Sequence, residues 1–256
     1  MEIKVKKGKA SSEKTEALIA FFEEGTKQPE GALKGLDQAL SGRIRRLLQS
    51  GDIRGKSGEI SLIWTDGAIP APRLFLIGLG KREKLDKESL RKASGVASKA
   101  LKRYRLGSGT VLVETIPVKK LSSEELGEVV TEGLRLGGYA FDRYKTVHEE
   151  PQKELKTVTL LVERGGAAQL EKGVRTATLV TDSVYRVRDL ISAPSNDITP
   201  GRLAAVAKEI GKSTGIKVTV LEKPAIERLG MGGLLGVSRA SHEGPRFIIL
   251  EYNLNR

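Results

Sequence analysis

The sequence contains no cysteine, which excludes a disulfide framework and a thiolate metal site. It holds only two histidines, and no His-x-x-x-His spacing of the kind that binds zinc on a helix occurs. The opening residues, MEIKVK, lack the apolar core of a secretory signal, and no apolar run approaches the roughly 20 residues of a membrane span. Together these absences predict a cytoplasmic protein.

The composition is that of a folded protein with a large excess of basic residues. Hydrophobic residues make up 39% of the 256 positions, charged residues make up 30%, and the net charge is +12. Such a charge attracts polyanions by long-range electrostatics and counterion release. Because the basic residues are spread along the chain, solvated helix faces explain them as well as nucleic-acid binding does, and both interpretations stay open.

The first 160 or so residues alternate between strand-like and helix-like segments, which predicts an α/β layer with a largely parallel sheet. The expected strands are residues 17–22, 60–64, 73–80, 110–115 and 155–162. The expected helices are residues 33–47, closed by Gly51, then 86–104 and 122–141. A further helix from about 167 to 189 leads into a second unit.

The second unit is predicted to open with a helix that has Thr199 as its N-cap and Pro200 as its first residue. A strand with clean alternation follows at residues 216–221, and a last strand holds four consecutive apolar residues at 247–250. Strands of that kind are usually covered on both faces. The apolar surface of this unit therefore requires more chain than these few elements supply.

Two glycine-rich stretches raise the question of phosphate binding. In residues 230–236 (GMGGLLG) the glycines follow a short helical segment, whereas a dinucleotide loop needs a strand before them. A helix end followed by a tight turn is therefore expected there. Gly78 and Gly80 follow a strand, but Lys81 is not followed by the Ser or Thr of a phosphate loop.

Catalytic side chains are equally hard to place. Ser238 resembles a hydrolase nucleophile elbow but lacks its second glycine, and His242 lies too close in sequence to complete the usual triad. His148 and His242 each neighbour a glutamate in a polar, loop-like context, which favours solvent exposure over metal binding. No residue is assigned as catalytic, cofactor-binding or metal-binding.

Three segments in this order resemble the leucine aminopeptidase (cytosol aminopeptidase) family. They are residues 188–200 (RDLISAPSNDITP), 229–237 (LGMGGLLGV) and 245–252 (PRFIILEY). Residues 76–80 (LIGLG) and 138–145 (GYAFDRYK) extend the likeness into the first unit. Where many members carry Gln-Gly after the Gly-Val step, this sequence has Arg239 and Ala240.

The resemblance implies a macro-domain-like α/β/α layer at residues 1–163, a linker helix at 164–188, and the truncated start of an α/β metallopeptidase domain at 189–256. Family members release N-terminal residues from peptides. They use two divalent metals, zinc or manganese, to activate water and polarise the scissile carbonyl. They assemble as homo-hexamers through their catalytic domains, so hexamer formation is open for a chain with only part of that domain.

The family's metal ligands are a lysine and several carboxylates in a segment that begins Lys-Gly-x-Thr-Phe-Asp-Ser-Gly-Gly. No such segment occurs in these 256 residues, so no ligand is carried over and the chain alone is expected to be inactive and metal-free. Two alternatives remain. One is DNA binding, implied by the basic charge and known for some bacterial members. The other is binding of ADP-ribose by the macro-like layer.

Overall fold

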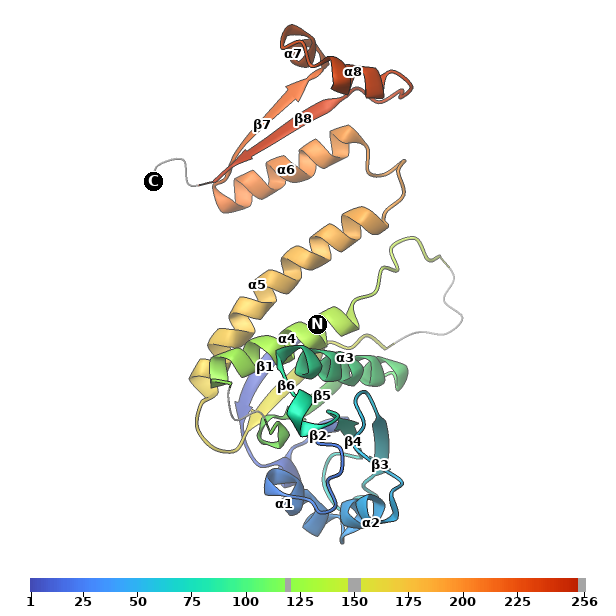
Figure 1. Cartoon of the computed structure of the whole chain (residues 1–256), viewed down its shortest axis with the longest axis vertical. Helices are drawn as coiled ribbons and strands as arrows, with labels where there is room; N and C mark the ends of the chain where they lie inside the picture. Colours follow the sequence, from blue (N-terminus) through green and yellow to red (C-terminus); the bar gives the residue numbers. More distant parts are fainter. Residues whose placement is uncertain (118–120, 147–152, 253–256) are drawn as a thin grey trace. The chain divides into compact units, whose positions relative to one another are not determined.

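The computed structural model describes residues 1–117, 121–146 and 153–252, and it divides into two compact units, Met1–Tyr185 and Arg186–Arg256. Each unit has its own sheet, and each is described by itself below (Figure 1). Within the described residues no helix is both long enough and apolar enough to cross a membrane.

Unit 1 is built on a six-stranded sheet with the strand order β1-β6-β5-β2-β4-β3. The strands are β1 (Glu2–Lys7), β2 (Leu18–Phe22), β3 (Ile60–Trp64), β4 (Arg73–Gly78), β5 (Ser108–Leu112) and β6 (Thr157–Val162). All neighbouring pairs are parallel except β3–β4. The predicted α/β class with a largely parallel sheet is therefore confirmed.

Helices cover both faces of this sheet, as Figure 1 shows for α3 and α4 on one side and α1 and α2 on the other. The helices of this unit are α1 (Gly31–Ala39), α2 (Arg43–Ser50), α3 (Lys87–Arg103), α4 (Ser123–Gly138) and α5 (Ala167–Ser192), with short 3₁₀ turns η1 (Ala10–Ser12), η2 (Arg82–Lys84) and η3 (Val113–Thr115). Strand β2 is buried along its whole length: Ile19 and Phe21 pack toward α3 and α4, and Leu18 and Ala20 toward α1 and α2.

The single helix predicted for residues 33–47 is two helices, and that prediction was wrong. Ser41 and Gly42 adopt left-handed backbone angles, with φ of 52° and 75°, between α1 and α2. A helix cannot continue through two such residues. Gly51, with φ of 78°, closes α2 as expected.

Several other boundaries differ from the sequence prediction. Strand β1 was not predicted, although its apolar residues Ile3 and Val5 alternate with charged ones. Strand β5 ends at Leu112, and the expected continuation to 115 is the 3₁₀ turn η3. The starts of α3 and α4 are fixed by capping boxes at Asp86 and Ser122, which satisfy backbone N–H groups that a helix start leaves unpaired.

Within its described residues, unit 2 contains a two-stranded antiparallel sheet, one longer helix and two short ones after the end of α5. After the last turns of α5 come α6 (Pro200–Thr214), β7 (Lys217–Glu222), α7 (Lys223–Arg228), α8 (Gly232–Ser238) and β8 (Arg246–Glu251). The expected start of α6 is confirmed, since the Thr199 hydroxyl accepts the N–H of Arg202 and Pro200 is the first helical residue. The buried hydrophobic residues among those described here are few: Ala204, Val206, Ala207 and Ile226.

Candidate functional site

The carboxyl ends of β2 and β5 form the point where the chain changes direction across the sheet of unit 1. From β2 the chain moves to β3 and then β4 on one side, and from β4 it crosses by α3 to β5 on the other side. In open α/β sheets, ligands bind in the crevice that such a reversal creates. A cavity of about 730 Å³ lies there, lined by Glu23 and Gly31 after β2 and by Glu114 and Thr115 after β5.

Some polar groups of this crevice are engaged by the protein itself, whereas one buried carboxylate oxygen of Glu23 has no hydrogen-bond partner among the described residues. Glu114 accepts the backbone N–H groups of Glu163 and Arg164, and one Glu23 oxygen lies 3.5 Å from the guanidinium of Arg82. The Thr115 hydroxyl donates to the Leu112 carbonyl at 2.7 Å. The Glu23–Arg82 contact joins the loops after β2 and β4, and Glu114 joins the segments after β5 and β6. The side chains of residues 27, 28 and 30 also line the crevice.

Aromatic stacking on a nucleobase is not provided by the lining of this crevice. Its two aromatic residues, Phe21 and Phe22, are 0% and 4% exposed, because their rings belong to the core on either face of β2. The crevice therefore has a suitable size and place for a small ligand, but its described residues give no support to the ADP-ribose alternative.

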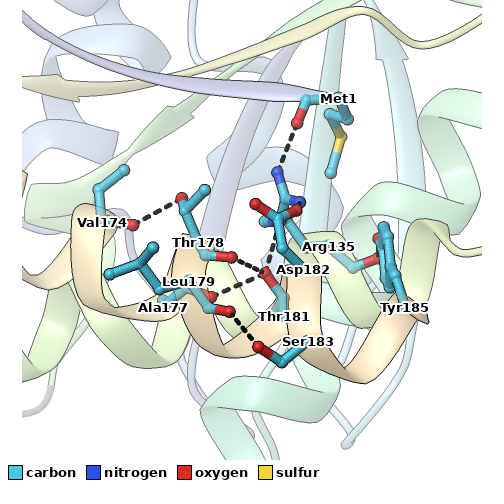
Figure 2. A network of polar contacts seen from close by, with 10 residues as sticks. All are labelled: Met1, Arg135, Val174, Ala177, Thr178, Leu179, Thr181, Asp182, Ser183 and Tyr185. Atoms are coloured by element: carbon cyan, nitrogen blue, oxygen red, sulfur yellow. Dashed lines mark hydrogen bonds and ion pairs between the residues drawn. The ribbon is translucent and has the colours of Figure 1, made fainter. Parts of the chain in front are cut away.

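A second polar centre lies on α4, around the buried side chain of Arg135 (Figure 2). Its guanidinium donates to the Met1 carbonyl at 2.8 Å and to the Thr181 hydroxyl at 2.5 Å, and it forms an ion pair with Asp182. The Tyr185 hydroxyl donates to the Arg135 carbonyl, and its ring lies 5.3 Å from the guanidinium. Arg135 thus ties α4 to the start of β1 and to α5, which is a structural role.

The glycine-rich segment 230–236 does not form a phosphate loop. Gly230, with φ of 63°, makes a tight turn after α7, as the sequence predicted, and Gly232 then begins α8, a helix that the sequence did not predict. The glycine-rich stretch around Gly78 and Gly80 also has a structural role. A Cβ on Gly78 would lie 2.1 Å from the Lys56 carbonyl oxygen, so this position at the end of β4 accepts only glycine.

The remaining candidate side chains do not come together. Ser238 ends α8 and donates its hydroxyl to the Leu235 carbonyl at 3.0 Å, while His242 is exposed in the segment between α8 and β8. His148 lies outside the described residues. Among residues 1–117, 121–146 and 153–252 no group of three or more His, Asp or Glu side chains could hold a metal ion. The described residues therefore do not fit a two-metal centre.

The fold and these features define a class of protein with a three-layer α/β unit followed by a second, smaller α/β unit. Two sequence models of one family match in the same order. The cytosol aminopeptidase family, N-terminal domain, matches residues 18–148, and the catalytic domain of that family matches residues 185–256. The chain belongs to the cytosol aminopeptidase family, which confirms the resemblance seen in the sequence.

Individual relatives show how much of a family member is present. A probable cytosol aminopeptidase of Alkaliphilus metalliredigens is 34% identical over 257 residues, which cover 99% of this chain and 51% of that protein. A mutant tomato leucine aminopeptidase is similar in structure, with a TM-score of 0.82, 24% identity, and coverage of 97% of this chain and 50% of that one. The chain thus spans about half the length of these relatives.

A third similar structure is the bottromycin maturation enzyme BotP in complex with Mn. It has a TM-score of 0.69 and 19% identity, and the match covers 93% of this chain and 45% of that one. At this identity the likeness concerns the fold alone. Both structural matches extend over nearly the whole of this chain, which agrees with the expected α/β layer followed by the start of a catalytic domain.

Proposed function

We propose that this chain forms the N-terminal domain and the opening elements of the catalytic domain of a metal-dependent aminopeptidase, which releases N-terminal residues from peptides. The observation that carries the proposal is the order of the two family matches, residues 18–148 and then 185–256, on the two structural units. Because the relatives are about twice as long, the activity is proposed for the complete protein and not for these 256 residues alone.

The proposed domain limits are 1–163 for the N-terminal layer, 164–188 for the linker and 189–256 for the start of the peptidase domain. Helix α5 (Ala167–Ser192) supports a helical linker, because it begins in unit 1 and ends in unit 2. Its first turns pack in the core of unit 1 through Leu170 and Val174. Limited proteolysis tests these limits. Cleavage is expected between the two units, whereas preferential cutting inside residues 18–112 would contradict the proposal.

Exposed apolar side chains on β8 support the view that unit 2 is covered by further elements in the complete protein. Phe247 is 40% exposed and Leu250 is 50% exposed, in a strand whose four consecutive apolar residues favour burial on both faces. A two-stranded sheet is marginally stable without more packing. The remaining part of a catalytic domain would supply that packing.

The complete enzyme is proposed to use two divalent metals, zinc or manganese, and the similar enzyme BotP forms a complex with Mn. We assign none of their ligands to this chain, because no suitable cluster of side chains exists among the described residues. The test is metal analysis of the purified 256-residue chain after incubation with zinc or manganese and dialysis. We expect no stoichiometric metal, and one or two tightly retained ions per chain would contradict the assignment.

DNA binding is a second candidate function, and helix α2 is the feature that favours it. Its sequence, RIRRLLQS, carries Arg43, Arg45 and Arg46 and no acidic residue. Two of these arginines contact acidic partners, Asp66 at 2.8 Å and Asp37 at 3.7 Å. Retention of duplex DNA should fall steeply with salt and weaken in an Arg45→Ala/Arg46→Ala variant. No retention at low salt would remove this candidate.

Location and assembly are proposed from the family alone. The cytosol is the proposed compartment, because the relatives are named cytosol aminopeptidases. A homo-hexamer is proposed only for the complete protein. Sedimentation of the 256-residue chain tests this distinction: a stable hexamer would show that the rest of the catalytic domain is not required for assembly.

A further inference from the structure

The sheet of unit 1 ends at β3, and one edge of that strand pairs with no other strand among the described residues. The Glu59 carbonyl accepts the N–H of Gly78, and the N–H of Thr65 donates to the Pro72 carbonyl. In an antiparallel pair, alternate residues point their backbone groups toward the partner. Residues 59, 61, 63 and 65 therefore face β4, and the N–H and C=O groups of Ile60 and Leu62 point to the free edge.

The side chains of these outward-facing residues lie on the α3 side of the sheet, at a groove. The groove has a volume of about 250 Å³ and lies between β3, β4 and α3. Its helix side is one stripe of α3 at three- and four-residue spacing, followed by the residue that caps the helix: Val96, Lys99, Ala100, Arg103 and then Tyr104. On the sheet side, Ile60, Leu62 and Phe75 supply an apolar wall, and the Phe75 ring lies 5.2 Å from that of Tyr104.

The charge of this groove is of one sign. Its only charged lining residues are Lys99 and Arg103, both exposed, and neither forms an ion pair with a described residue. Beside it on the same strand, Ile60 is 36% exposed and Trp64 is 50% exposed. Exposed apolar residues on an edge strand are unusual, because such an edge readily pairs with another chain.

We propose that this edge and groove bind an extended peptide segment that has apolar side chains at alternate positions and an acidic residue beside them. The peptide adds a strand to β3 through the outward groups of Ile60 and Leu62, which is a common mode of peptide recognition. Its apolar side chains enter the groove, and its carboxylate lies against Lys99 and Arg103. Arg43 donates to the Trp64 carbonyl and so limits the added strand at that end.

The charge favours this occupant over a second copy of the chain. Each copy carries a net charge of +12, and pairing two β3 edges would bring two such basic surfaces together. The unpaired backbone groups favour a peptide over a small amphipathic anion. An anion of that kind would fill the groove and contact Lys99 and Arg103. It would not form hydrogen bonds with the outward N–H and C=O groups of Ile60 and Leu62.

Trp64 is the only tryptophan of the chain and lies on β3, so its fluorescence directly reports binding of a peptide to that strand. The probe is the peptide acetyl-Glu-Thr-Val-Thr-Val-Thr-Glu-amide, titrated into the full 256-residue chain at low salt. We expect a saturable change in Trp64 emission. The analogue with lysine at both ends should bind at least about tenfold more weakly, since it meets Lys99 and Arg103 with like charge.

Two further peptides test the added strand itself. Each is N-methylated at two alternate residues, one at the two valines and the other at the first two of the three threonines. Strand addition uses the N–H groups of one set only, so one version should lose binding and the other should retain it. Equal binding of both versions at the affinity of the parent peptide would overturn strand addition and indicate an amphipathic anion in the groove.

The protein variant Lys99→Glu/Arg103→Glu should weaken binding of the acidic peptide at least about tenfold. Its matched control is Lys208→Glu/Lys212→Glu, a double charge reversal at the same four-residue spacing on α6, which should leave the affinity unchanged. An equal loss of peptide affinity in both variants would mean that the peptide responds only to the net charge of the chain, and it would contradict the proposal. Sedimentation of the free chain decides against it too if the chain is a dimer in which Trp64 is shielded from a soluble fluorescence quencher.

Discussion

Replacing Arg135 by methionine should destabilise unit 1 more than any other single polar substitution that we propose. Arg135 is 7% exposed, and its guanidinium contacts the Met1 carbonyl, the Thr181 hydroxyl and the Asp182 carboxylate (Figure 2). Methionine retains the apolar stem of the side chain and removes all three polar contacts. The buried Thr181 hydroxyl and the partly buried Met1 carbonyl then lose a donor that water replaces poorly.

The expected cost follows from the exposure of each partner. A lost hydrogen bond to a buried or partly buried neutral acceptor costs about 1 kcal/mol, and Arg135 makes two of them. The ion pair adds at most about 1 kcal/mol, because the Asp182 side chain is 59% exposed and solvent screens it. The free energy of unfolding should therefore fall by about 3 kcal/mol, which corresponds to a drop in Tm of about 6–12 °C for a unit of this size.

Urea unfolding followed by Trp64 fluorescence measures this loss, because the only tryptophan lies in unit 1. The control is Asp182→Asn, which removes the exposed charge and leaves the buried hydrogen bonds of Arg135 in place. It should cost under about 1 kcal/mol. The reasoning is refuted if Arg135→Met costs no more than Asp182→Asn, because the buried acceptors would then contribute nothing.

Three further perturbations test local features of the fold. The hydrogen bond from Lys87, with those from Ser122, lowers the pKa of Glu125 to about 2. The charged carboxylate therefore stabilises the folded state above the ordinary pKa of 4.5, and this stabilisation is lost as the pH falls toward 2. The urea midpoints of wild type and Glu125→Gln should differ at pH 6 and converge at pH 2. Gly173→Ala places a Cβ 1.9 Å from a backbone oxygen of α4 and should cost about 1–3 kcal/mol in urea unfolding, whereas Gly165→Ala, in open space, should change stability by under about 0.5 kcal/mol. Thr199→Ala removes the α6 N-cap and should cost about 1 kcal/mol, read as faster amide exchange confined to unit 2.

The sequence predicted those elements whose signal is local. The uninterrupted apolar run at β2 indicated a fully buried strand, and Thr199 with Pro200 indicated the start of α6; the structure has both. The break between α1 and α2 was missed, because the apolar period continues through Ser41 and Gly42. That dipeptide is itself a turn signal, so the error came from giving periodicity more weight than glycine.

Features that depend on distant segments could not be predicted. The crevice after β2 exists because β5 lies beside β2, and nothing near Glu23 in the sequence indicates that neighbour. Arg135 lies in an amphipathic helix, and the spacing of its apolar residues does not predict the hydrogen bonds that Arg135 makes to Met1 and Thr181. The groove beside β3 likewise requires α3 to pack across the sheet edge, which only the fold establishes.

The central claim is that these 256 residues carry the N-terminal domain and the start of a peptidase domain without its metal ligands. The most direct test is hydrolysis of leucine p-nitroanilide, with zinc or manganese added, by two purified proteins. One is this chain, and the other is this chain joined after Arg256 to the remaining half of the Alkaliphilus metalliredigens relative. The account predicts no turnover by the first and metal-dependent turnover by the second. Metal-dependent turnover by the 256-residue chain alone would contradict it.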